Sequence, residues 1–145
     1  MVEPKLPHYK SKQQILFAKD AKPEALADYG RRYFAAGWLS DALEFFARAG
    51  DKRGLEEIRA RSIHEGDVFI FRRTLDALAE PATDAEWKQL AENARKLGKL
   101  QFAREAFRMA QDRKSLDEIE QLINPPAETE TAPARPTEGS DSELV

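Results

Sequence analysis

Apolar and small residues in the middle of the chain recur at helical intervals. In residues 26–49 they are separated by 3, 1, 3, 4, 5, 4 and 3 positions, and residues 87–110 follow the same intervals. Residues 55–78 carry a weaker copy of this pattern. Because residues three and four apart share one face of an α-helix, each run predicts helices with one buried face. No stretch alternates apolar and polar residues over more than a few positions, so we expect no strands.

Glycine, proline and capping residues divide this region into separate helices. The expected starts are Pro23, Ser40, Asp51, Asp67 and Thr83, and the expected ends are Gly37, Gly50, Gly66, Pro81 and Gly98. Thr83 and Glu86 have the spacing of a capping box. Two more helices are expected at about 100–111 and 113–123.

The chain also repeats itself. When it is shifted by 61 residues, segment 37–58 aligns with segment 98–119 and 10 of 22 positions are identical. Self-similarity at a fixed offset is typical of stacked units, each of which cannot bury its apolar face alone.

The interval pattern resembles that of the tetratricopeptide repeat (TPR) family over about 100 residues. The resemblance implies an all-α fold, a right-handed α–α superhelix (a TPR-like solenoid) of about three helical hairpins plus a terminal capping helix. It also implies that small residues such as Gly30 let helices approach closely, and that Phe46 and Phe107 reach the next unit. The middle copy departs from the pattern where Arg59 and Phe71 replace small residues.

Three zones differ in composition. Residues 1–20 are a basic N-terminal segment in which residues 13–19 can form a short helix, with Ile15, Leu16 and Phe17 capping the first repeat. Residues 21–123 form the TPR-like helical repeat domain. Residues 124–145 are predicted to be a disordered acidic tail rich in Pro, Thr and Glu. With four prolines and no aromatic residue, this tail cannot offset the entropy cost of ordering.

The overall composition narrows the classes of function. With 34% charged and 41% hydrophobic residues, the chain is typical of a soluble globular protein. A net charge of −3 argues against a nucleic-acid-binding surface, which is normally basic. The N-terminus lacks the apolar run of a secretory signal, and nowhere are there enough consecutive apolar residues to span a membrane. We therefore expect a cytoplasmic protein that binds neither nucleic acid nor membranes.

The sequence carries no recognisable catalytic or metal-binding motif. It has no cysteine and two histidines, of which His64 falls at a predicted helix end where it can interact with the helix dipole. The acidic pairs at 56–57 and 117–118 fall in the first turns of predicted helices, where the dipole stabilises carboxylates. We predict no enzymatic activity, no cofactor and no metal site.

A partner-binding surface remains as the candidate site. In the architecture that the resemblance implies, the first helix of each hairpin lines the concave side. Phe34 and Ile63 are apolar where packing does not require it, and Arg31, Lys88 and Arg95 are expected nearby on the helices of this side. Such a surface suits an amphipathic or acidic-apolar peptide. We predict a non-catalytic protein–protein interaction module, an adaptor or scaffold, with these five residues contacting a protein or peptide partner.

Two alternatives remain open at this stage. The N-terminal residues 15–17, or a second copy of the chain, can cover Phe34 and Ile63 and leave no free surface there. The chain can also be a structural self-associating subunit of a homo-oligomer or larger assembly, in which apolar edges at the ends of the array pair with another chain.

Overall fold

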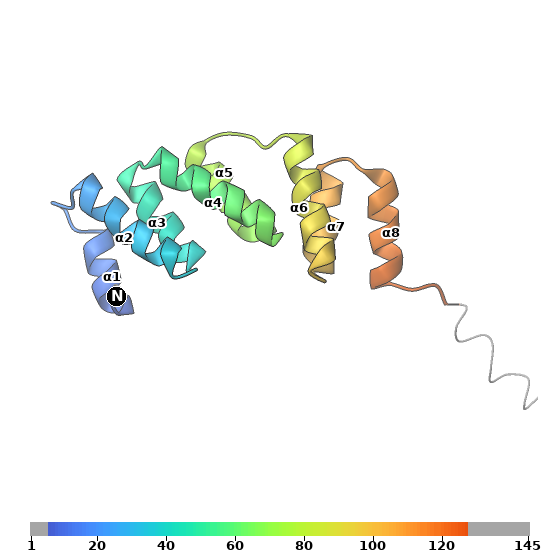
Figure 1. Cartoon of the computed structure of the whole chain (residues 1–145), viewed down its shortest axis with the longest axis horizontal. Coiled ribbons are helices and arrows are strands. Elements are labelled where there is room, and N and C mark those ends of the chain that lie inside the picture. Colours follow the sequence, from blue (N-terminus) through green and yellow to red (C-terminus); the bar gives the residue numbers. More distant parts are fainter. Residues whose placement is uncertain (1–5, 128–145) are drawn as a thin grey trace, which may run out of the picture.

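Helices make up most of the backbone in the computed structural model, which describes residues 6–127 (Figure 1). Within that range there are eight α-helices and no strand. They are α1 (Tyr9–Leu16), α2 (Pro23–Ala35), α3 (Leu39–Ala49), α4 (Lys52–Glu65), α5 (Val68–Leu78), α6 (Asp84–Lys96), α7 (Leu100–Met109) and α8 (Arg113–Ile123). The all-α prediction is confirmed for this part of the chain. The predictions for residues 1–5 and for the tail beyond residue 127 concern parts of the chain outside the described residues. None of the helices in the described range is long and apolar enough to cross a membrane.

Most of the predicted helix ends are confirmed. Asp51, Asp67 and Thr83 each cap a helix by accepting a backbone hydrogen bond, and Thr83 and Glu86 form the complete capping box. Gly37, Gly50, Gly66 and Gly98 all have positive φ angles, which glycine adopts without strain.

Two predicted boundaries are wrong. The helix expected to begin after Ser40 begins at Leu39, and the Ser40 hydroxyl instead accepts a hydrogen bond from Arg73 at 2.7 Å. The helix expected to run to Pro81 ends at Leu78, because Ala79 already adopts a left-handed conformation with φ of 56°.

The N-terminal helix exists but lies earlier than the predicted 13–19. It begins just after Pro7 and ends at Leu16, so Phe17 is its C-terminal cap and is 58% exposed. Lys12 and Leu16, which are four residues apart, share the buried face of this helix. Of the three residues predicted to cover the adjacent helices, Leu16 is part of the apolar core and Ile15 packs against it, whereas Phe17 does neither.

The helices pack in two layers. The most extensive contacts join the pairs α2–α3, α4–α5 and α6–α7, which are consecutive in sequence and connected by short turns. Contacts between pairs follow a regular order: α2, α4 and α6 touch in succession, as do α3, α5 and α7. The N-terminal α1 packs on α3, and α8 packs on α7, so these two helices lie at opposite ends of an elongated body (Figure 1).

The repeated phenylalanines lie at equivalent buried positions, as predicted. Phe46 and Phe107 are both fully buried, one in each of two apolar clusters. The Phe46 ring is bounded by Gly30 of α2 and by Gly54 of α4. A Cβ at Gly30 would lie 2.7 Å from that ring, and one at Gly54 would lie closer still. Only residues without a side chain allow α2 and α4 to close around Phe46.

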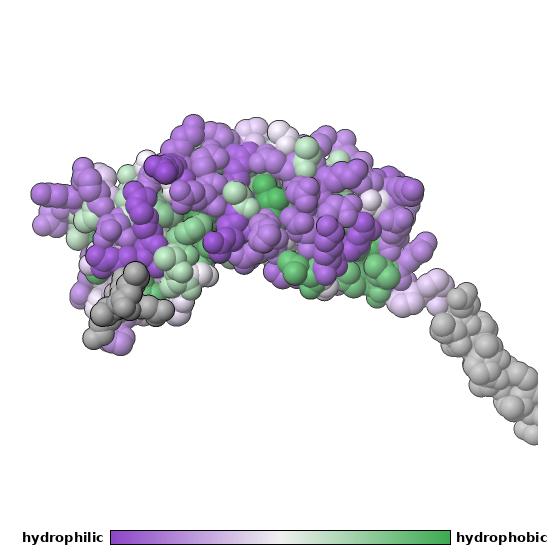
Figure 2. All heavy atoms as spheres, in the orientation of Figure 1, coloured by the Kyte–Doolittle hydropathy of each residue, from purple (hydrophilic) through white to green (hydrophobic). Residues whose placement is uncertain are grey.

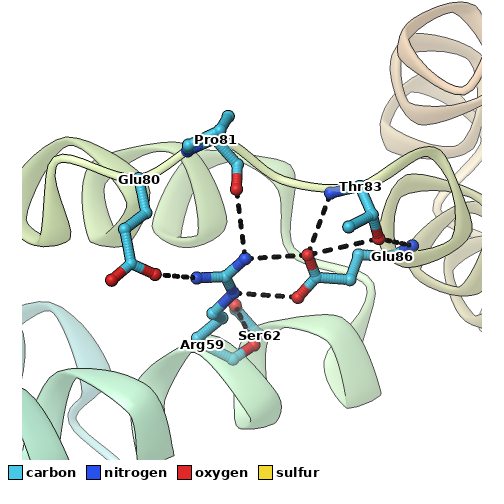
Figure 3. A network of polar contacts seen from close by, with 6 residues as sticks. All are labelled: Arg59, Ser62, Glu80, Pro81, Thr83 and Glu86. Atoms are coloured by element: carbon cyan, nitrogen blue, oxygen red, sulfur yellow. Dashed lines mark hydrogen bonds and ion pairs between the residues drawn. The ribbon is translucent and has the colours of Figure 1, made fainter.

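Arg59 joins the middle hairpin to the next one. Its guanidinium donates two hydrogen bonds of 2.8 Å to the Glu86 carboxylate at the start of α6, and one of 3.1 Å to Glu80 (Figure 3). It also donates to the Pro81 carbonyl in the loop between α5 and α6. The Arg59 side chain is only 12% exposed. Arg59 stands where the repeat pattern has a small residue, and its long side chain holds the loop between α5 and α6 in place.

The same network makes stability depend on pH through Glu86. Hydrogen bonds from Arg59 hold the pKa of Glu86 below its ordinary value of 4.5, against the opposing effect of burial. A carboxylate with a lowered pKa in the folded state stabilises the protein above its unfolded-state pKa, and this contribution is lost as the pH falls. We expect the free energy of unfolding to fall more steeply below about pH 5 in the parent than in Glu86→Gln. Urea melts at several pH values provide the measurement, and equal slopes would contradict the prediction.

Candidate functional site

The three predicted steering cations already have carboxylate partners within the chain. Arg31 lies 3.3 Å from Asp51, Lys88 lies 3.8 Å from Asp112, and Arg95 contacts both Glu92 at 2.7 Å and Glu118 at 3.3 Å. All three come from α2 and α6, in the layer that also contains α4. A partner's acidic groups would have to compete with these internal pairs.

The two predicted apolar residues pack against different clusters. Phe34 packs against the first apolar cluster and Ile63 against the second, and both side chains are half-buried. The Arg61 guanidinium lies 4.9 Å from the centre of the Phe34 ring. A shallow depression there is lined by Phe34, Glu57, Ala60, Arg61 and His64. The N-terminal helix α1 packs on α3, and none of residues 15–17 lines this depression.

A groove lies in the other layer of helices, the one that contains α3, α5 and α7. It is bordered by α1, α3 and α5, and we call it the α3–α5 groove. Its volume is about 370 Å³. Its lining is largely apolar with charged residues among it: Leu16, Phe17, Leu43, Glu44, Ala47, Arg48, Arg73 and Ala77. Leu16 and Leu43 are buried, whereas Phe17, Ala47 and Ala77 are exposed. The groove therefore has a hydrophobic floor that is open to a partner.

The arginines of the α3–α5 groove differ from the others of the described chain. Of the twelve arginines in residues 6–127, ten form an ion pair with a carboxylate of the chain. The two without a described carboxylate within 4.0 Å are Arg48 and Arg73, and both line this groove. The two arginines without a described carboxylate partner thus lie together at one apolar surface.

Packing on aromatic rings restricts both guanidinium groups. Arg48 lies 5.5 Å from the centre of the Phe17 ring, and Arg73 lies 5.6 Å from that of Phe69. Arg73 also donates to Ser40. Arginine has five N–H donors, so donors remain on each group for a ligand.

Glu44 is the one acidic residue in the groove lining, and its carboxylate already has a partner from outside the lining. Lys12 of α1 donates to Glu44 at 2.9 Å and to Asp41 at 2.5 Å. Burial by itself lowers the pKa of Lys12, but the hydrogen bonds and charges of these two acids outweigh burial and raise the pKa. Lys12 thus attaches α1 to α3 and neutralises the one carboxylate in the groove lining.

Sequence reasoning missed the α3–α5 groove. Arg48 and Arg73 look like ordinary cations on solvated helices, and nothing local indicates that they lack acidic partners. The charge pattern around Arg48 gives no such signal either, since Glu44 lies four positions before it and Asp51 three positions after it, and only the structure shows that Lys12 and Arg31 pair with these acids.

No cluster of three or more His, Asp or Glu residues in the described part of the chain could hold a metal ion. Comparison with protein-family models, with curated proteins and with solved structures gives no match. The function of the site is therefore inferred from its own geometry.

Proposed function

We propose that the chain is a non-catalytic protein–protein interaction module, an adaptor or scaffold in which helical hairpins stack as a TPR-like solenoid and present surface to a protein or peptide. The observation that supports this proposal is the open apolar α3–α5 groove with its two uncompensated arginines. Grooves that combine an apolar floor with a few convergent polar groups are the usual ligand sites of proteins.

The α2–α4–α6 layer remains the second candidate surface. Arg31, Phe34, Ile63, Lys88 and Arg95 were predicted to bind the partner there, and that stays a prediction. Its three cations already form ion pairs with carboxylates of the chain, so we rank this layer below the α3–α5 groove as a binding surface.

Self-association is the alternative function. In the orientation of Figure 2 the surface is mostly hydrophilic, with apolar patches along one edge below α6 to α8. The exposed large apolar residues of this part of the chain are Leu97, Met109 and Leu122. Pairing of such edges between two copies would make the chain a structural subunit.

Site-specific photo-crosslinking in the source organism tests the proposed function. A benzophenone side chain at Ala77 probes the α3–α5 groove, one at Ala60 probes the depression beside Phe34, and one at exposed Ala85 is the control. We expect a reproducible adduct with another protein from Ala77 and none from Ala85. Adducts from Ala60 alone would indicate that the partner binds the α2–α4–α6 layer. Adducts between copies of the chain would favour self-association. No adduct from either site would contradict an interaction module.

A further inference from the structure

We propose that the α3–α5 groove selects a peptide segment in which apolar side chains are flanked by carboxylates. This inference rests on the proposed function and adds the chemistry of the partner. It depends on three features of the groove: its floor, its charge and the rigidity of its arginines.

The floor determines the apolar part of the ligand. Leu16 and Leu43 form its buried base, and the exposed Phe17, Ala47 and Ala77 border it. A volume of about 370 Å³ is at the lower end for ligand pockets, so it suits one or two anchoring side chains and not a whole enclosed molecule. The small side chains of Ala47 and Ala77 let a peptide backbone approach α3 and α5.

The charge determines the flanking residues. Since Glu44 is held by Lys12, the uncompensated charges of the groove are Arg48 and Arg73. A carboxylate can accept two parallel hydrogen bonds from one guanidinium, and such charge-assisted bonds are among the strongest in proteins. A basic peptide would place like charges together, which disfavours its binding.

Preorganisation adds to the selectivity. The contacts of Arg48 with Phe17, and of Arg73 with Phe69 and Ser40, restrict both side chains before a ligand arrives. Less conformational entropy is then lost on binding. Arg72, the neighbour of Arg73 in sequence, is paired with Glu105 and lies over Trp87, so it does not share this role.

The experiment begins with a displayed library of random peptides selected on the full chain. We expect enriched peptides to carry Asp or Glu beside Leu, Ile or Phe. The best peptide is then synthesised in three forms: as selected, with its acids replaced by their amides, and with its acids replaced by lysine. Binding is measured by fluorescence anisotropy. We expect the amide form to bind at least about tenfold more weakly.

Charge reversal in the protein provides the matched test. Arg48→Glu with Arg73→Glu should weaken binding of the acidic peptide at least about tenfold and should restore binding of the lysine form. Arg53→Glu makes the same kind of charge change on α4, where the side chain is 87% exposed and lies outside the groove, and should leave binding unchanged. Circular dichroism and thermal melts check folding, and the single variant Arg48→Glu keeps the test valid if the double variant is unstable.

The possible failures are distinguishable. If no peptide is enriched, the proposed function as a peptide-binding module fails. If peptides bind but respond to Arg31→Glu and Lys88→Glu and not to the groove variants, the function stands and the groove is wrong. If enriched peptides lack acids, the partner chemistry is wrong. If the parent self-associates in sedimentation and the double variant is monomeric, a second copy occupies the groove, which overturns the assignment to a partner.

Discussion

Replacing Phe46 or Phe107 with alanine is expected to lower the free energy of unfolding by about 3–5 kcal/mol. Both rings are fully buried, and each lies in one of the two apolar clusters. Around Phe46 the neighbours are backbone atoms of Gly30 and Gly54. Backbone cannot move into the cavity without shifting a whole helix, so relaxation would recover little of the loss. A small domain has only about 5–15 kcal/mol in total, and either change should nearly unfold the protein.

Denaturant melts of the two variants, followed by circular dichroism, provide the measurement. Phe69→Ala is the matched control, because this phenylalanine is 60% exposed on α5 and its loss should change stability by about 0.5 kcal/mol or less. A loss below about 1 kcal/mol for Phe46→Ala would show that this ring does not hold α2 and α4 together. A large loss at Phe46 with none at Phe107 would instead show that the two repeat copies are not energetically equivalent.

Replacing Arg59 with alanine is expected to cost about 2–3 kcal/mol, less than the range for a fully buried ion pair because Glu86 remains partly accessible to water. The change removes two hydrogen bonds to Glu86, one to Glu80 and one to the Pro81 carbonyl. It also leaves the carboxylate of Glu86 without its main partner. Because these contacts join α4 to the start of α6, we expect the loop between α5 and α6 to become accessible to proteases.

Arg53→Ala is the control for this substitution. It lies on the same helix, is 87% exposed, and pairs only with Glu57 four residues away. Such exposed pairs contribute about 0.3–0.5 kcal/mol, so its loss should be small. The double variant Arg59→Ala with Glu86→Gln should lose less than the sum of the two single changes, because both act on one interaction. Strict additivity would mean that the Arg59–Glu86 contact does not stabilise the fold.

The two candidate surfaces of the molecule differ in how their charge is used. Arginines on α2, α4 and α6 pair with acids of the same or the neighbouring helix. On the opposite layer, Arg48 and Arg73 border an apolar groove without a described acidic partner. Charge that is already paired contributes less to steering a ligand than charge that is not, which is why the α3–α5 groove ranks above the predicted surface.

Helices, their caps and their buried faces were determined by the sequence itself. Local chemistry is sufficient for these features: Asp51, Asp67 and Thr83 each bond a backbone N–H three residues ahead, and glycines at helix ends adopt positive φ angles. The burial of Phe46 and Phe107 follows from the same source, because the spacing of the repeat places them on the apolar face of each helix.

Only the tertiary structure decided which charges are satisfied and which surface is open. Ion pairs such as Arg59 with Glu86 and Lys12 with Glu44 join residues 27 and 32 positions apart, and no local pattern predicts such partners. The sequence could not single out Arg48 and Arg73 for the same reason, since whether an arginine has an acidic partner depends on the whole packed molecule. The position of α1 was also decided at this level. Lys12 and Leu16 seat this helix on α3, which places Phe17 at the edge of the groove and not in the core.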